Sequence, residues 1–229
     1  MRVYVGYDRR EHEAYRVAVD TLYETSGIVA ECLDSDKLAA HGLLRRSVDM
    51  RDGKFYDLPS NASASTEFAV SRFLTPILCQ SGWALFTDCD VVFLEDVHGL
   101  LDYADHSKAV VVVKHDYRAK EQTKMDGQLQ THYARKNWSS VMLFNCDHPA
   151  NRRLTLADVN ERPGRDLHAF YWLNDSEIGE LPSEWNWLVN EQDKPAQPCI
   201  AHFTLGGPWI PNWTPSPHDE IWLEASEYI

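Results

Sequence analysis

The first half of the chain alternates short apolar runs with a stretch of helical spacing. Residues 2–7 and 28–33 are rich in β-branched and aromatic side chains, and residues 11–25 between them place apolar residues three and four positions apart. Unbroken apolar runs, typical of strands buried on both faces, follow at 83–87, 109–113 and 139–144. This order predicts an α/β fold with a largely parallel sheet and helices on both of its faces.

The intervening segments have other patterns. Residues 66–80 have helical spacing and end before Gly82, so they predict a helix with a kink or early stop at Pro76. Residues 45–64 contain Gly, Pro, Ser and Asn and are expected to form a loop. The last third is rich in Trp and Pro, which favours short strands and loops folded over a site.

Composition narrows the class of protein. The 229 residues are 44% hydrophobic and 25% charged, which is typical of one soluble globular domain. No apolar run has the length of a transmembrane segment, and the N-terminus resembles a strand and not a signal peptide, so we expect a cytoplasmic protein. A net charge of −13 argues against a nucleic-acid partner. The cysteines lack CxxC spacing and are expected to be free thiols.

Two aspartates follow the apolar run at residues 83–87. In an extended backbone Asp88 and Asp90 point to the same side while Cys89 points away. Ligands of open parallel sheets gather at the carboxyl ends of the strands, where this pair is expected to lie. Two facing carboxylates repel unless a cation or protons lie between them, and oxygen ligands suit Mg²⁺ or Mn²⁺. The pattern therefore indicates a metal site, although a D-x-D string also occurs in solvated turns.

Several segments, in order, resemble the retaining family-8 type of glycosyltransferase with the GT-A fold. They are VYVGYD, STEFAVSRFLTP, LFTDCDVVFLEDV, NWSSVMLFNC, LNDSEIGEL and AHFTLGGPW. The resemblance implies a Rossmann-like sheet flanked by helices in a single domain, residues 1–229. It further implies a nucleotide-binding half, residues 1–115, and a donor-sugar and acceptor half, residues 116–229.

The resemblance also implies roles for individual residues. Tyr7 and Asp8 would contact the nucleobase, and Arg72 would bind the donor. Asp88 and Asp90 would hold Mn²⁺ or Mg²⁺, with His202 as a third ligand. The remaining implied positions are Ser139 and Ser140 near the donor sugar, Asp175, Ser176 and Glu177 where sugar and acceptor meet, and Gly206 and Gly207 beside the diphosphate. In a front-face displacement Asp175 would orient or stabilise the reacting groups.

Two departures from the family pattern stand out. The last motif lacks the lysine that usually contacts the diphosphate, and Lys124 and Lys136 are candidates to replace it. The family's N-A-G at the sugar strand is replaced by Trp138-Ser139-Ser140, so the identity of the donor sugar does not carry over.

Plainer interpretations stay open for several side chains. His202 has the setting of a core histidine, and Arg72 that of an ordinary surface arginine. The histidines at 115, 132 and 148 fit no zinc spacing and are expected at the surface or at helix ends. The tryptophans at 185, 187, 209 and 213 are expected in the core, or alternatively on an aromatic platform for a sugar.

The leading functional hypothesis is a metal-dependent glycosyltransferase. It would move a hexose from a nucleotide sugar, most simply a UDP-sugar, to a hydroxyl of a glycan, a lipid-linked sugar or a small molecule, with retention. The alternatives are a metal-dependent sugar nucleotidyltransferase or phosphohydrolase, and a non-catalytic carbohydrate-binding relative.

Overall fold

A mixed six-stranded sheet forms the centre of the protein in the computed structural model, which describes residues 1–51, 54–115, 135 and 137–227. Its strands, in spatial order, are β10 (Ile178–Leu181), β8 (Val110–Val113), β9 (Val141–Asn145), β6 (Trp83–Thr87), β1 (Arg2–Gly6) and β2 (Glu31–Leu33). Strand β9 runs antiparallel to both of its neighbours, and the other adjacent pairs are parallel. The sequence prediction of a mostly parallel sheet is confirmed, with one reversed strand.

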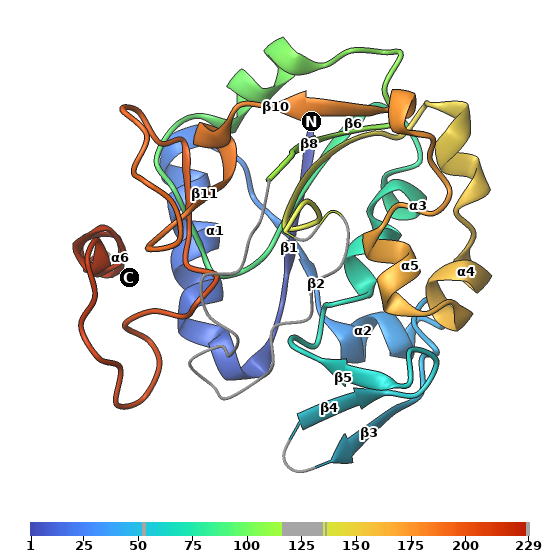
Figure 1. The fold of residues 1–229 in the computed structure, drawn as a ribbon, viewed down its shortest axis with the longest axis horizontal. Helices are drawn as coiled ribbons and strands as arrows, with labels where there is room; N and C mark the ends of the chain where they lie inside the picture. The colour runs from blue at the N-terminus through green and yellow to red at the C-terminus, as the bar shows by residue number, and fades with distance from the viewer. Residues whose placement is uncertain (52–53, 116–134, 136, 228–229) are drawn as a thin grey trace.

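Helices cover both faces of this sheet, as Figure 1 shows. Helix α1 (His12–Ser26) packs against β1 on one side, and α3 (Thr75–Cys79) packs against β6 and β9 on the other. Every residue of β8 and β9 is buried, which explains why these strands are continuous apolar runs.

A second sheet of three strands carries part of the C-terminal region. It consists of β11 (Trp187–Leu188), β12 (Ile200–His202) and β7 (Val91–Phe93), with β12 in the middle. Helix α6 (Asp219–Ser226) packs on α1 and β7 beside this sheet. Because β7 follows β6 closely in the chain, the short connection between them joins the two sheets.

The prediction of a loop over residues 45–64 is wrong. This segment forms a small antiparallel sheet of β3 (Val48–Arg51), β4 (Lys54–Asp57) and β5 (Ala62–Ala64), at the lower right of Figure 1. The residues that suggested a loop, Pro59 to Asn61, occupy only the turn between β4 and β5. Arg46 fixes the base of the sheet by an ion pair of 2.7 Å with Asp57, both side chains being buried.

The helix expected over residues 66–80, with a kink or early stop at Pro76, is also wrong. The chain makes a 3₁₀ helix, η2 (Ser71–Leu74), followed by the short α3. Pro76 lies in the first turn of α3, where a missing N–H breaks no helical hydrogen bond, so the proline begins the helix and does not end it. The other helices are η1 (Arg9–Glu11), α2 (Ser35–Ala40), η3 (Val97–Tyr103), η4 (Pro149–Arg153), α4 (Leu156–Glu161), α5 (Gly164–His168), η5 (Asp175–Glu177) and η6 (Ser183–Asn186).

Two further expectations concern the whole chain. All five cysteines are free thiols, as the sequence predicts, and three of them are buried. Among the residues described, no helix combines the length and apolar character needed to cross a bilayer. The division into halves at residues 115 and 116 stays a prediction.

Candidate metal centre

The connection Asp88-Cys89-Asp90 links β6 of the central sheet to β7 of the smaller one. The Asp88 N–H donates to the Ser140 carbonyl at 2.9 Å, and the Asp90 carbonyl accepts from the Phe203 N–H at 2.8 Å. Backbone bonds to both sheets therefore hold this connection in a fixed shape. Cys89 is fully buried, whereas the Asp88 and Asp90 side chains are 13% and 15% exposed, consistent with the predicted alternation.

His202 reaches the aspartates from the smaller sheet. In the antiparallel pairing of β12 with β7 it lies opposite Val91, next to Asp90. One ligand atom from each of Asp88, Asp90 and His202 lies within 4.8 Å of the others, and His202 Nε2 is 3.3 Å from Asp90 Oδ1. Two carboxylate oxygens and one imidazole nitrogen form a donor set that fits Mn²⁺ or Mg²⁺.

The charge of the aspartates changes the protonation of His202. Burial lowers the pKa of this imidazole, but the charge and hydrogen bond of Asp90 outweigh burial and raise the pKa above its ordinary value. Without a cation the ring thus compensates part of the negative charge. A bound cation would take over this compensation.

Arg72 is the second positive group at the site. It lies on η2, it is 5% exposed, and its Nη1 is 2.8 Å from Asp88 Oδ1 and donates to the Ser139 carbonyl at 2.9 Å. Its guanidinium also lies 5.2 Å from the ring centres of Phe68 and Phe86. Arg72 is therefore a buried partner of Asp88 and not the surface arginine of the plainer interpretation.

Three nearby residues were missed as site residues. Asn186 Oδ1 lies 2.9 Å from His202 Nδ1, and His115 contacts the same asparagine from its other side. Glu11 lies behind the connection, 3.4 Å from the Cys89 thiol, and burial, followed by Asp90 and Asp8, raises its pKa to about 8. Neither Asn186 nor Glu11 carries a recognisable motif, so only the fold reveals them.

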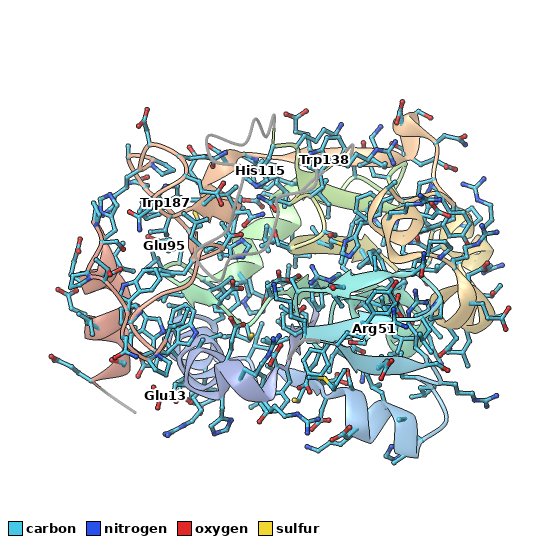
Figure 2. All side chains as sticks on the ribbon, turned by 60° about the horizontal axis from the view of Figure 1, so that its bottom comes forward. Glu13, Arg51, Glu95, His115, Trp138 and Trp187 are labelled. Carbon is cyan, nitrogen blue, oxygen red and sulfur yellow. The ribbon has the colours of Figure 1, made fainter. Side chains whose placement is uncertain are left out.

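His115 corrects an expectation. It was predicted at the surface or at a helix end, but it is 7% exposed and lies two residues beyond the end of β8. Its carbonyl accepts from the Trp138 indole N–H at 3.1 Å, and Figure 2 shows the two residues close together. His148 does lie at a helix end, where it caps η4.

Ser139 and Ser140 lie behind the metal centre with buried, bonded hydroxyls. Ser139 Oγ is 2.6 Å from His168 Nδ1, and Ser140 Oγ donates to the Asn137 carbonyl at 2.8 Å. Both serines are at most 4% exposed. Their hydroxyls are therefore already bonded within the protein, and contact with a donor sugar stays a prediction.

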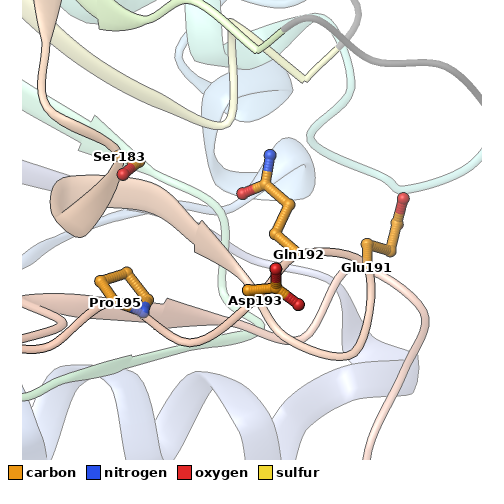
Figure 3. Close-up of a pocket in the computed structure, with 5 residues that line it drawn as sticks. All are labelled: Ser183, Glu191, Gln192, Asp193 and Pro195. Atoms are coloured by element: carbon orange, nitrogen blue, oxygen red, sulfur yellow. The ribbon is translucent and has the colours of Figure 1, made fainter.

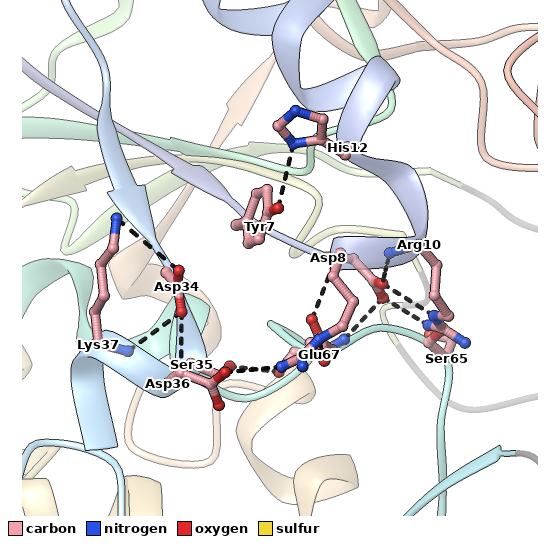
Figure 4. A network of polar contacts seen from close by, with 11 residues as sticks. Tyr7, Asp8, Arg10, His12, Asp34, Ser35, Asp36, Lys37, Ser65 and Glu67 are labelled. Atoms are coloured by element: carbon pink, nitrogen blue, oxygen red, sulfur yellow. Dashed lines mark hydrogen bonds and ion pairs between the residues drawn. The ribbon is translucent and has the colours of Figure 1, made fainter. Parts of the chain in front are cut away.

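Asp8 has no exposed carboxylate to offer to a nucleobase. It is fully buried and accepts from the Arg10 backbone and guanidinium and from the Glu67 N–H, the network drawn in Figure 4. Tyr7 remains half-buried, with its hydroxyl 3.2 Å from His12 Nδ1. The geometry therefore argues against a base contact by Asp8 and leaves Tyr7 as the candidate.

The glycine pair follows β12 in a tight turn. Gly206 has a φ of 104°, and its N–H donates to the Phe203 carbonyl at 2.7 Å. A Cβ on Gly206 would lie 2.4 Å from Ile210, and one on Gly207 would lie 2.2 Å from Trp209. The glycines are needed for the turn itself, and the Gly206 amide is already used within it.

The structure does not bring Asp175 and Glu177 into contact with Asp88. The Glu177 carbonyl accepts from the Ala109 N–H, at the start of β8, whereas Asp88 follows the end of β6. Strands β6 and β8 point the same way because both are antiparallel to β9, so these positions lie on opposite rims, roughly 15 Å apart along the strands. Asp175 pairs with Arg135, and Glu177 caps its own 3₁₀ turn. Arg135 in turn lies over the Trp138 ring, 5.7 Å from its centre. The roles implied for Asp175 and Glu177 stay predictions.

The remaining candidates divide between core and surface. Trp185 and Trp187 are buried, as expected, and Trp209 and Trp213 are partly exposed. Lys124, Lys136 and His132 lie outside the described residues.

Comparison with solved structures identifies the fold. The galactosyltransferase LgtC, solved with donor and acceptor sugar analogues, matches 100% of this chain and 96% of its own with a TM-score of 0.59 and 15% identity. The glycosyltransferase GlyE of Streptococcus pneumoniae matches 98% of this chain with a TM-score of 0.57 and 13% identity. This chain spans 59% of GlyE. The architecture is therefore the GT-A fold, and these identities carry no conclusion beyond the fold.

Sequence comparison gives a nearer relative. No protein-family model matches the chain. Protein CDI of Arabidopsis thaliana is 43% identical over 234 residues, an alignment that covers 99% of this chain and 86% of the plant protein. The chain belongs to the same protein family as Protein CDI.

Proposed function

We propose that this protein is a metal-dependent glycosyltransferase that uses a nucleotide sugar. The supporting observation is the cluster of Asp88, Asp90 and His202 at the carboxyl end of β6 in a GT-A fold. A divalent cation held there would stabilise the negative charge that develops on a leaving nucleoside diphosphate. The donor is proposed to be a UDP-hexose, and the acceptor a hydroxyl of a glycan, a lipid-linked sugar or a small molecule.

The side chains of the site have distinct tasks in this proposal. Arg72 holds Asp88 in place and keeps positive charge beside the diphosphate position. Tyr7, at the end of β1, is proposed to contact the base. The backbone turn at Gly206 and Gly207 is proposed to lie close to the diphosphate. Transfer with retention follows from the family-8 resemblance, and a cytoplasmic location stays a prediction.

The experiment compares the wild type with the double variant Asp88→Ala, Asp90→Ala. Binding of UDP with Mn²⁺ is measured by calorimetry, and products from a panel of nucleotide sugars are identified by mass spectrometry. The proposal predicts a nucleoside diphosphate as the released product and no metal-dependent nucleotide binding in the double variant. Release of pyrophosphate would indicate a nucleotidyltransferase, and unchanged binding in the double variant would exclude the mechanism.

The stereochemical course needs its own measurement. Proton NMR of the first product formed from an α-linked donor is expected to show an α-linked sugar. A β-linked first product would contradict retention and leave glycosyl transfer itself intact.

A further inference from the structure

Asn186 forms the centre of a buried hydrogen-bond network behind the metal centre. It is the last residue of η6, directly before β11, and none of its surface is exposed. Its Oδ1 lies 2.9 Å from His202 Nδ1. Its Nδ2 lies 2.9 Å from Ser140 Oγ and 3.0 Å from His115 Nε2. Its Nδ2 also lies 3.5 Å from the Asn137 carbonyl. All four polar contacts join Asn186 to parts of the chain that are distant in sequence.

The neighbours of Asn186 allow its amide one orientation. The Ser140 hydroxyl donates its proton to the Asn137 carbonyl at 2.8 Å, so Ser140 Oγ must accept from Asn186. The group facing Ser140 is therefore the Asn186 NH₂, and the carbonyl oxygen faces His202. An amide oxygen only accepts hydrogen bonds, so His202 Nδ1 must carry a proton.

His115 is compatible with the same orientation in its Nδ1–H tautomer. Burial, together with the charge of His202, lowers its pKa to about 4, so the ring is neutral at physiological pH. A neutral His115 can accept the second Asn186 proton at Nε2. The Gln192 amide nitrogen lies 3.1 Å from His115 Nδ1. Because a bare Nε2 leaves the ring proton on Nδ1, a hydrogen bond here requires the Gln192 amide oxygen to face the ring. Gln192 lines a surface pocket of about 430 Å³ with Glu191 and Asp193 (Figure 3). The network therefore extends from the metal centre to the surface.

Asp90 alone would favour the opposite protonation of His202. Its Oδ1 is 3.3 Å from His202 Nε2, and a carboxylate there attracts a proton to Nε2. A proton on Nε2 would block that nitrogen as a metal ligand, because only a bare imidazole nitrogen coordinates a metal ion. The hydrogen bond to Asn186 opposes this effect from the other side of the ring.

We propose that Asn186 is a positioning residue of the metal centre, which holds the His202 proton on Nδ1 and thereby presents a bare Nε2 to the cation. This inference rests on the proposed metal-dependent function. Hydrogen bonds of this kind fix the orientation and tautomer of metal-bound histidines, and their loss typically weakens metal binding about 10- to 100-fold.

The first test needs neither metal nor substrate. Metal-free protein labelled with ¹⁵N-histidine is titrated by NMR until the His202 ring is observed to be neutral, with the signal assigned from His202→Gln. The proposal predicts the Nδ1–H tautomer in the wild type. A wild-type ring with its proton on Nε2 would overturn the proposal, whatever the fate of any variant.

The second test compares Asn186→Leu with Asn186→Asp. Leucine cannot accept the His202 proton, so we expect the ring to shift towards the Nε2–H tautomer and Mn²⁺ binding, measured by EPR titration, to weaken about 10- to 100-fold. Aspartate keeps the acceptor, and this variant is expected to retain the Nδ1–H tautomer and to bind Mn²⁺ no more weakly than the wild type.

The outcomes separate the two proposals. Wild-type protein that binds no Mn²⁺ would contradict the proposed metal function. Wild-type protein that binds Mn²⁺, with an Asn186→Leu variant of equal affinity and unchanged tautomer, would contradict only the role of Asn186.

Discussion

Replacement of Arg72 by methionine tests the charge balance of the site. Methionine keeps apolar contact with the Phe68 and Phe86 rings but removes the ion pair with Asp88. The side chains of Arg72 and Asp88 are 6% and 13% exposed. Two unit charges about 4 Å apart in a medium of effective dielectric constant near 20 attract by about 4 kcal/mol. Loss of one partner of a buried pair typically costs about 3–5 kcal/mol. We expect the free energy of unfolding of the metal-free protein to fall by about 3–4 kcal/mol.

The assay is urea denaturation in the presence of a chelator, with a double-mutant cycle. Asp88→Asn is combined with Arg72→Met, and the two changes should be strongly non-additive because each removes the same interaction. Arg2→Met serves as the control, since Arg2 pairs with Glu31 at 2.6 Å but both side chains are at least 42% exposed. An exposed pair of this kind is expected to contribute less than about 1 kcal/mol.

Saturating Mn²⁺ adds a second readout. A cation beside Asp88 replaces the positive charge of the missing guanidinium, so the destabilisation caused by Arg72→Met should be smaller with Mn²⁺ than with chelator. A loss below about 1 kcal/mol for Arg72→Met, or additivity with Asp88→Asn within about 0.5 kcal/mol, would refute the reasoning.

Two other predictions concern packing and pH. Gly6→Ala should lower the free energy of unfolding by about 1–3 kcal/mol, because the new Cβ would lie 2.4 Å from the Phe68 ring. At Gly27 a new Cβ meets no atom within 4 Å but the φ is 66°, so Gly27→Ala should lower it by about 1 kcal/mol. Equal losses for the two variants in urea denaturation would contradict the packing argument. His115 has a pKa of about 4 when folded, so between about pH 6.5 and 4 the unfolded chain binds more protons and stability falls as the pH falls. Between pH 7.5 and 5 the wild type should lose about 2 kcal/mol more than His115→Gln, and equal losses would show that His115 is not the cause.

The sequence predicts the strands of the central sheet because short, unbroken apolar runs are typical of strands that are buried on both faces. Residues 84–87 and 141–145 are buried throughout, and their composition is correspondingly apolar, as expected of strands buried on both faces. The small β3–β5 sheet is missed because its strands are exposed or half-buried and its turn residues dominate the local composition. The role of Pro76 is predicted wrongly because the same local sequence allows a proline either to begin a helix or to end one, and the conformation of the residues before it decides between the two.

The candidate site shows a similar limit. The spacing of Asp88 and Asp90 predicts their shared direction from the alternation of an extended backbone, and the structure has that geometry. The support from Asn186 depends on the pairing of β11 and β12, which no local pattern reveals. Motif matching also places Asp175 and Glu177 beside the donor, which stays a prediction, because their position relative to Asp88 depends on the register of β8 against β10 and not on a local pattern.

The most direct test of the metal centre is anomalous diffraction at the manganese edge from crystals grown with MnCl₂ and UDP. The account predicts a peak between Asp88, Asp90 and His202, with Nε2 as the histidine ligand. Manganese bound elsewhere, with these three side chains uncoordinated, would contradict it.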